Sequence, residues 1–103
     1  MKPLIIPPAA QRDPNSVQML SAWIAEKGLH CSLNVGMWTA AGTPEARAWG
    51  ILLADTARHV ANAMASSLGV AQPDALAAVL EAMHSELAQP SSRVRGSFLP
   101  GHT

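Results

Sequence analysis

One run of side chains has the spacing that acid–base chemistry needs. Asp55, His59, Asn62 and Ser66 follow one another at intervals of three or four residues, so in a helix they line one side. Asp55 could then orient the His59 imidazole, as a general acid–base pair requires, with Arg58 further round the helix. Asp55, Arg58 and His59 are therefore the candidate ligand-binding residues. The alternative is an ordinary solvated helix face that carries an i,i+4 charge pair.

Other reactive residue types lack the spacing of a site. His30 and Cys31 are neighbours, so on a strand they point to opposite faces and cannot easily bind one metal ion together. The four histidines follow no metal-ligand spacing, and a single cysteine excludes an intramolecular disulfide. The glycines form no phosphate-binding loop, and no serine lies in a nucleophile elbow. We therefore expect no catalytic residue, no metal and no cofactor.

The charges of the chain are balanced. Seven basic and seven acidic residues give a formal net charge of zero, and the basic residues do not cluster apart from Arg93 and Arg95. A protein that binds nucleic acid needs a concentrated positive face, so we expect no such partner. No window approaches the roughly 18 apolar residues of a membrane span, and Leu4–Ile6 is too short for the core of a signal peptide. We expect a cytoplasmic protein with no membrane contact.

The first third of the chain predicts an arm followed by a strand. Four prolines within residues 1–15 favour an extended N-terminal arm, whose Leu4–Ile6 run could dock on the body or on a partner, or stay free. Apolar and polar residues alternate over 29–35, which indicates a strand. Residues 17–27 fit either a helix or a second strand. In the strand interpretation Ala25–Gly28 is a hairpin loop, and Gly28 supplies a positive φ.

Two helices are predicted in the second half. Thr43 can cap the first helix, Pro44 suits its first position, and Glu45 faces the positive end of its dipole. An apolar stripe that includes Trp49, Leu53 and Leu68 continues from there to Gly69, a natural stop.

The second helix begins at Pro73 and Asp74 and reaches about Ala88. The short link before it predicts an antiparallel helical hairpin. Residues 36–43 connect strand to helix. Residues 89–103, rich in Pro, Gly and Ser, predict a flexible tail.

Several strings in the sequence resemble a known family. They are LSAWIA at 20–25, GLHCSL at 28–33, WGILLAD at 49–55 and ARHVA at 57–61, and they resemble a family of small bacterial proteins, similar in length to this chain, whose domain has unknown function. The resemblance covers residues 15–88, leaving the arm and the tail outside. It implies a hairpin followed by helices, and hence a strand within 17–27, and a bacterial source. It implies no activity and no catalytic residue.

The expected fold class is α+β, with a β-hairpin and then two antiparallel helices (ββαα) in a single domain over residues 16–88. A lone hairpin is marginal in water and leaves edges unpaired. A homodimer could join two hairpins into a four-stranded antiparallel sheet; the alternative is a monomer whose sheet edge is covered by the arm. We predict a non-enzymatic, self-associating accessory or interaction module. The alternative is a small-molecule-binding protein or weak enzyme that uses Asp55, Arg58 and His59.

Overall fold

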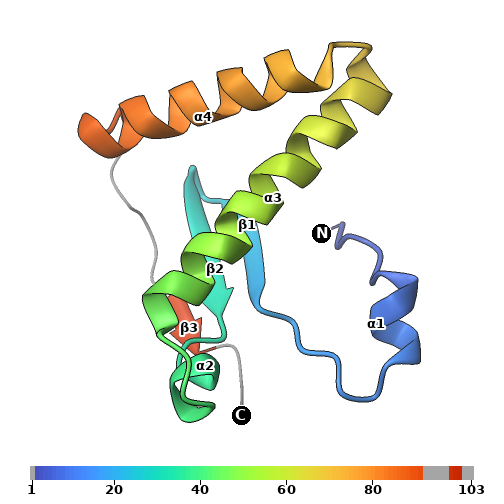
Figure 1. Cartoon of the computed structure of the whole chain (residues 1–103), viewed down its shortest axis with the longest axis vertical. Helices are drawn as coiled ribbons and strands as arrows, with labels where there is room; N and C mark the ends of the chain where they lie inside the picture. Colours follow the sequence, from blue (N-terminus) through green and yellow to red (C-terminus); the bar gives the residue numbers. More distant parts are fainter. Residues whose placement is uncertain (1, 92–97, 101–103) are drawn as a thin grey trace. The chain divides into compact units, whose positions relative to one another are not determined.

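The chain folds into two compact units of different class. A computed structural model describes residues 2–91 and 98–100. Contacts group residues 2–35 with 98–100 into one unit, and residues 36–91 into the other. The first unit holds three strands and a short helix, and the second is helical (Figure 1). The chain is therefore α+β, with a hairpin that precedes the two long helices, as predicted.

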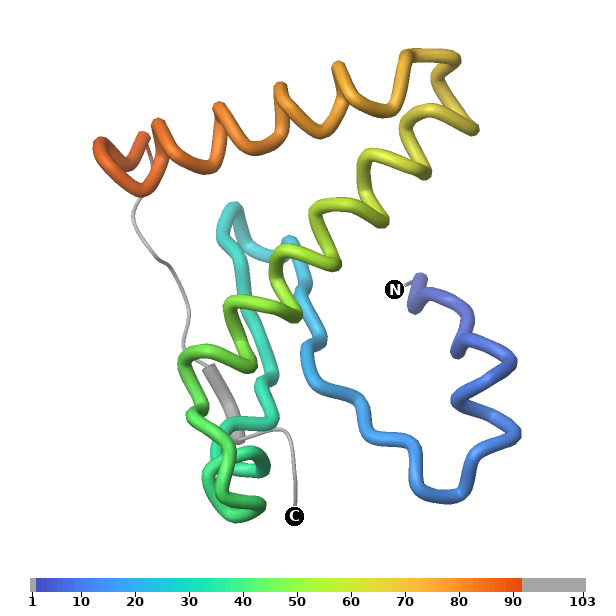
Figure 2. Tube along the Cα trace, in the orientation of Figure 1, coloured from blue at the N-terminus to red at the C-terminus, as the bar shows by residue number. Residues whose placement is uncertain are grey.

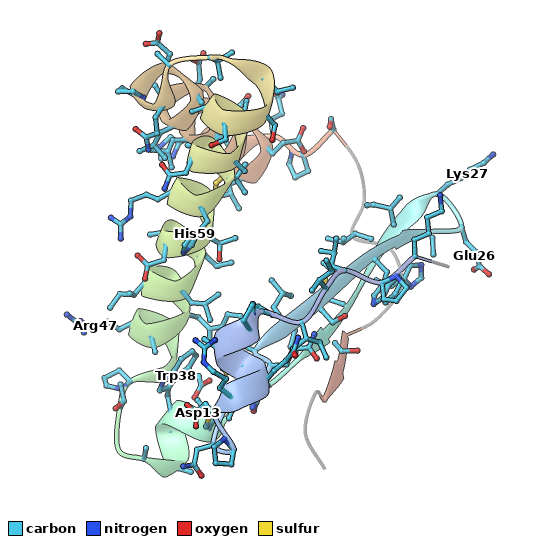
Figure 3. The ribbon with its side chains drawn as sticks, turned by 90° about the vertical axis from the view of Figure 1, so that its right-hand side faces the viewer. Asp13, Glu26, Lys27, Trp38, Arg47 and His59 are labelled. Atoms are coloured by element: carbon cyan, nitrogen blue, oxygen red, sulfur yellow. The ribbon has the colours of Figure 1, made fainter. Side chains whose placement is uncertain are left out.

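The hairpin consists of β1 (Leu20–Ala25) and β2 (Gly28–Leu33). The strands are antiparallel, and Ala25 lies opposite Gly28, so residues 17–27 contain the strand that the resemblance implied. The prediction of a positive φ at Gly28 is wrong. Glu26 and Lys27 carry it instead, with φ of 51° and 63°, because a two-residue turn must match the twist of its flanking strands. Both residues lie at the tip of the hairpin (Figure 3).

A third strand corrects the prediction of a flexible tail. β3 (Phe98–Pro100) pairs parallel to β2, with Phe98 opposite Cys31. The rest of the predicted tail that follows Ser91 lies outside the described residues. The strand order is β1-β2-β3, so β3 satisfies backbone groups on the far edge of β2.

The prolines predicted that the whole N-terminal arm is extended, and this prediction is wrong for part of the arm. Residues 8–12 form the short helix α1 (Pro8–Arg12), because proline fits the first helical position and the residues after it favour helix. The Gln11 side chain donates to the Ile6 carbonyl at 2.8 Å, and the Ser16 hydroxyl donates to the Ala10 carbonyl at 2.8 Å. The arm therefore winds through a locally closed turn before β1 (Figure 2).

The helical unit contains α2 (Met37–Ala40), α3 (Glu45–Leu68) and α4 (Gln72–Ala88). The short α2 lies within the stretch predicted as a plain connection. Gly69 ends α3 with φ 72°, and its N–H bonds to the Ala65 carbonyl at 3.2 Å, which is the left-handed cap expected of glycine. From this turn α3 and α4 run in opposite senses and diverge (Figure 1).

The described part of the chain buries few large side chains. Its buried apolar residues are Ala57, Ala61 and Ala75. Larger members of the predicted α3 stripe remain accessible, with Leu53 45% and Leu68 69% exposed. The chain thus leaves much apolar surface for other contacts.

Candidate functional site

The candidate residues on α3 meet the start of α4 at a shallow hollow. Asp55, Arg58 and His59 line it together with Asn62 and Gln72, and its volume is about 390 Å³. The structure therefore brings the three predicted residues together. Gln72 was missed by sequence reasoning. The available signal was the Gly69 turn, which returns the first residue of α4 toward α3.

The Asp55 carboxylate accepts a hydrogen bond and ion pair from the Arg58 guanidinium. This pair replaces the Asp55–His59 contact that the spacing also allowed. The side chains are 49% and 62% exposed, and an exposed pair of this kind contributes about 0–1 kcal/mol to stability. The site therefore holds a carboxylate neutralised by a cation. His59 follows Asp55 by four residues, about one helical turn, and Figure 3 shows it on α3.

A second hollow shares two of these residues. Asp55 and His59 border it, its volume is about 430 Å³, and its remaining lining is mainly apolar: Trp38, Ala48, Ile51, Leu52 and Thr56. The Trp38 ring meets the Trp49 ring edge to face, with centroids 5.8 Å apart and planes at 89°, a favoured aromatic geometry. Asp55 and His59 thus lie between a polar hollow and a mainly apolar hollow.

The Glu45 carboxylate organises the start of the helical unit. Oε2 accepts from the Gly36 N–H and from Trp49 Nε1, both at 3.0 Å. Oε1 accepts from the Thr39 N–H at 2.9 Å and from the Thr39 hydroxyl at 3.0 Å. The Gly36 bond, with smaller help from Thr39 and Trp49, holds the pKa of this carboxyl below its ordinary 4.5 although partial desolvation opposes the shift.

These contacts change the predicted capping of α3. Thr43 makes no cap bond with its side chain; Pro44 precedes the helix, and the Thr43 N–H donates to the Trp38 carbonyl at 2.8 Å. Glu45 was predicted only to face the helix dipole. In the structure it also receives the free N–H groups at the start of α2, which a carboxylate satisfies well.

Among the residues that the structure describes, the outer edge of β1 pairs with no other strand. The Asn34 N–H donates to the Met19 carbonyl at 3.0 Å, so Met19 and Asn34 form a hydrogen-bonded pair of the ladder. Two and four residues further along β1, Ser21 lies opposite Ser32 and Trp23 lies opposite His30. Hydrogen-bonded and non-bonded pairs alternate in an antiparallel ladder. Leu20, Ala22 and Ile24 therefore turn their backbone groups away from β2.

His30 and Cys31 are both half-buried, and the thiol is free. As neighbours in β2 they point to opposite faces. Within residues 2–91 and 98–100, no three His, Cys, Asp or Glu side chains are grouped to hold a metal ion. No helix of this described part has the length and apolar character to cross a membrane.

A family model decides which family the sequence represents. The model of DUF5076, described as a domain of unknown function, matches residues 3–91. The chain belongs to the DUF5076 family. The match confirms the resemblance seen in the sequence, and it extends further toward the N-terminus than predicted, so it includes most of the arm.

A solved structure supports the fold of this DUF5076 member. It is a protein of Rhodopseudomonas palustrus CGA009, described as a "putative pyruvate dehydrogenase", with 24% identity and a TM-score of 0.68 over 94% of each chain. At this identity the similarity establishes the fold alone. No curated protein matches the chain.

Proposed function

We propose that this protein is a non-enzymatic, self-associating interaction module, and that two copies join through the outer edge of β1. The observation that carries the proposal is the unpaired edge of β1, described above. In the described residues β1 has β2 as its sheet partner, while β2 pairs with β3 on its other side. An antiparallel β1–β1 contact across a two-fold axis would make the predicted four-stranded antiparallel core, with β3 added at each end.

The composition of β1 supports this contact. The strand LSAWIA carries no charge and no proline, although natural proteins protect exposed edges with both. Ile24 is 82% exposed, and a paired edge would bring its apolar surface close to a second copy. Within the described residues the arm adds no strand to this edge, since the strand order is β1-β2-β3.

Light scattering on an edge variant tests the proposal. Proline at position 22 removes an outward N–H and leaves the β1–β2 ladder intact, because that N–H faces away from β2. We expect the wild type to have twice the 10.8 kDa mass and Ala22→Pro to be a folded monomer. Ala22→Val keeps the N–H and should remain a dimer. A folded Ala22→Pro dimer, or a wild type that is monomeric at every concentration, would overturn the proposal.

A second candidate function is small-molecule binding on α3. The observation that favours it is the pair of adjoining hollows that share Asp55 and His59, one polar and one apolar. Small-molecule sites combine apolar walls with a few placed polar groups in this way. A ligand should raise the melting temperature of the wild type. His59→Ala should lose that shift while keeping its own stability; an undiminished shift would exclude this site.

A cytoplasmic location and a bacterial source remain predictions from the sequence. We expect no reaction, no nucleic-acid partner and no cofactor. The expected partner is a second copy of the chain.

A further inference from the structure

The two outermost strands of the sheet differ in length. β2 pairs on one side with β1, and on its other side it pairs with β3 over Cys31–Leu33. The described strands have the order β1-β2-β3, and all three belong to the same compact unit. β1 has six residues, whereas β3 has three. The sheet therefore ends in a long strand at one edge and in a very short strand at the other.

The side of β2 that faces away from β1 lacks the residues that protect a sheet edge. The β2 sequence GLHCSL contains no Lys, Arg, Asp, Glu or Pro, although natural proteins guard edges with charges and proline. His30 and Ser32 belong to the hydrogen-bonded pairs with β1 described above. Cys31 and Leu33 therefore turn their backbone groups to the other side. Without a partner strand these groups would be a template for a strand of another chain.

The backbone of β3 supplies a partner for these groups. The register places Leu99 opposite Ser32. In a parallel ladder a residue bonds to the two residues that flank the one opposite to it, so Leu99 turns its backbone toward Cys31 and Leu33. The Leu99 N–H then faces the Cys31 carbonyl, and the Leu99 carbonyl faces the Leu33 N–H.

β3 itself has two features of an edge that accepts no further strand. Its three residues make it a very short edge strand, which is one device that natural sheets use against further pairing. Pro100 has no N–H, and because Leu99 faces β2, the donor that Pro100 lacks would point outward. β1 has neither feature, since it has six residues and no proline. The sheet therefore has one protected edge and one unprotected edge.

We propose that β3 is an edge cap that stops self-association at two copies. The inference rests on the pairing through β1 proposed above and sets its limit. With β3 in place, two copies joined through β1 form a sheet that is capped at both ends. Without β3, the β2 edges of separate dimers would pair with one another, and the sheet would grow in both directions. The partner of an uncapped β2 edge is thus the β2 edge of another copy.

Light scattering on full-length Leu99 variants tests the cap. Leu99→Pro removes the N–H that faces the Cys31 carbonyl, whereas the matched control Leu99→Val keeps this N–H and favours a strand. With a reductant present, so that Cys31 forms no disulfide, Leu99→Val should stay at twice 10.8 kDa. Leu99→Pro should exceed the dimer mass by about twofold or more, and its mass should rise with concentration. A folded Leu99→Pro that remains a dimer at every concentration would overturn the cap and leave the β1 contact standing.

Combination with the β1 variant separates the two proposals. Ala22→Pro alone should be a monomer, because its β1 edge is blocked and its β2 edge is capped. Ala22→Pro with Leu99→Pro should instead be a dimer that pairs through the uncapped β2 edges. A double variant that is monomeric at every concentration would count against the cap. A monomeric wild type would overturn the β1 contact, and a dimer of Leu99→Pro would then still support a cap on β2.

Hydrogen exchange in the wild type tests the cap without any substitution. The Leu33 N–H faces β3, whereas the Ala22 N–H faces the outer edge of β1. Because β3 belongs to the same chain as β2, the Leu33 amide should stay protected on dilution while the Ala22 amide loses its protection. If the two amides exchange equally fast in the dilute protein, β3 does not cap β2 and the inference is wrong.

Discussion

The Glu45 carboxylate shows how one side chain can join two helices. It accepts from Gly36 and Thr39 at the start of α2 and from Trp49 on α3. The Gly36 bond contributes most to the lowering of its pKa from 4.5. A carboxyl with a lowered pKa in the folded state stabilises that state above its unfolded pKa. The contribution is lost as the pH falls through the lowered folded value.

In Glu45→Gln the free energy of unfolding should therefore fall less steeply with decreasing pH than in the wild type. We expect the variant to be less stable than the wild type at pH 7, and the difference to shrink as the pH falls below about 4.5. Urea denaturation between pH 7 and pH 3 measures this directly. Glu81→Gln, on the exposed part of α4, is the matched control and should follow the wild type. If the free energies of unfolding of Glu45→Gln and the wild type differ by the same amount at every pH, the ionised Glu45 carboxylate is not the source of the stabilisation.

The sequence predicted which residues line the candidate site, but not which of them would pair with one another. Spacing placed Asp55, Arg58 and His59 on one helix, and the structure lines one hollow with them. Residues three and four apart are both neighbours on a helix, so spacing could not choose between Arg58 and His59 as the partner of Asp55. The Gly69 turn indicated that the start of α4 returns toward α3, but it could not place Gln72 in the hollow, because that depends on how α4 packs against α3.

The hairpin turn has residue types that fit its backbone conformation poorly. Glu26 and Lys27 both have positive φ, a conformation that costs an L-residue with a side chain about 1–2 kcal/mol. Asn-Gly is the pair that such a turn prefers. The double variant Glu26→Asn, Lys27→Gly should therefore raise the free energy of unfolding by about 1 kcal/mol or more.

Thermal and urea denaturation would measure the effect of the turn variant. Glu26→Gln with Lys27→Arg keeps side chains at both positions and should leave stability close to that of the wild type. Destabilisation by Asn-Gly would show that Glu26 or Lys27 makes contacts worth more than the strain of the turn.

Elements with a strong local signal were predicted well, and those that depend on distant pairing were not. The long helices end at Gly69 and at Ala88, as predicted. Residues 20–25 contain several good helix formers, yet they form a strand because β2 pairs with them. β3 had no local signal at all, since it exists only through pairing with a strand far away in the sequence.

The whole molecule has more apolar surface than its own core uses. The buried apolar side chains among the described residues are three alanines. Meanwhile the edge of β1, the run at Leu4–Ile6 and the far half of α4 present larger ones to their surroundings. A chain of 103 residues can form a single core but leaves a large part of its surface exposed when it folds alone. Self-association through β1 would give its open edge a partner, and the sequence predicted that need from its lone hairpin.

Hydrogen exchange of individual β1 amides tests the central claim most directly. The amides of Ser21, Trp23 and Ala25 face β2, whereas those of Leu20, Ala22 and Ile24 face the open edge. We expect both sets to be protected at high protein concentration, and only the outward set to lose protection on dilution. An outward set that exchanges freely at every concentration, beside a protected inward set, would contradict pairing through β1.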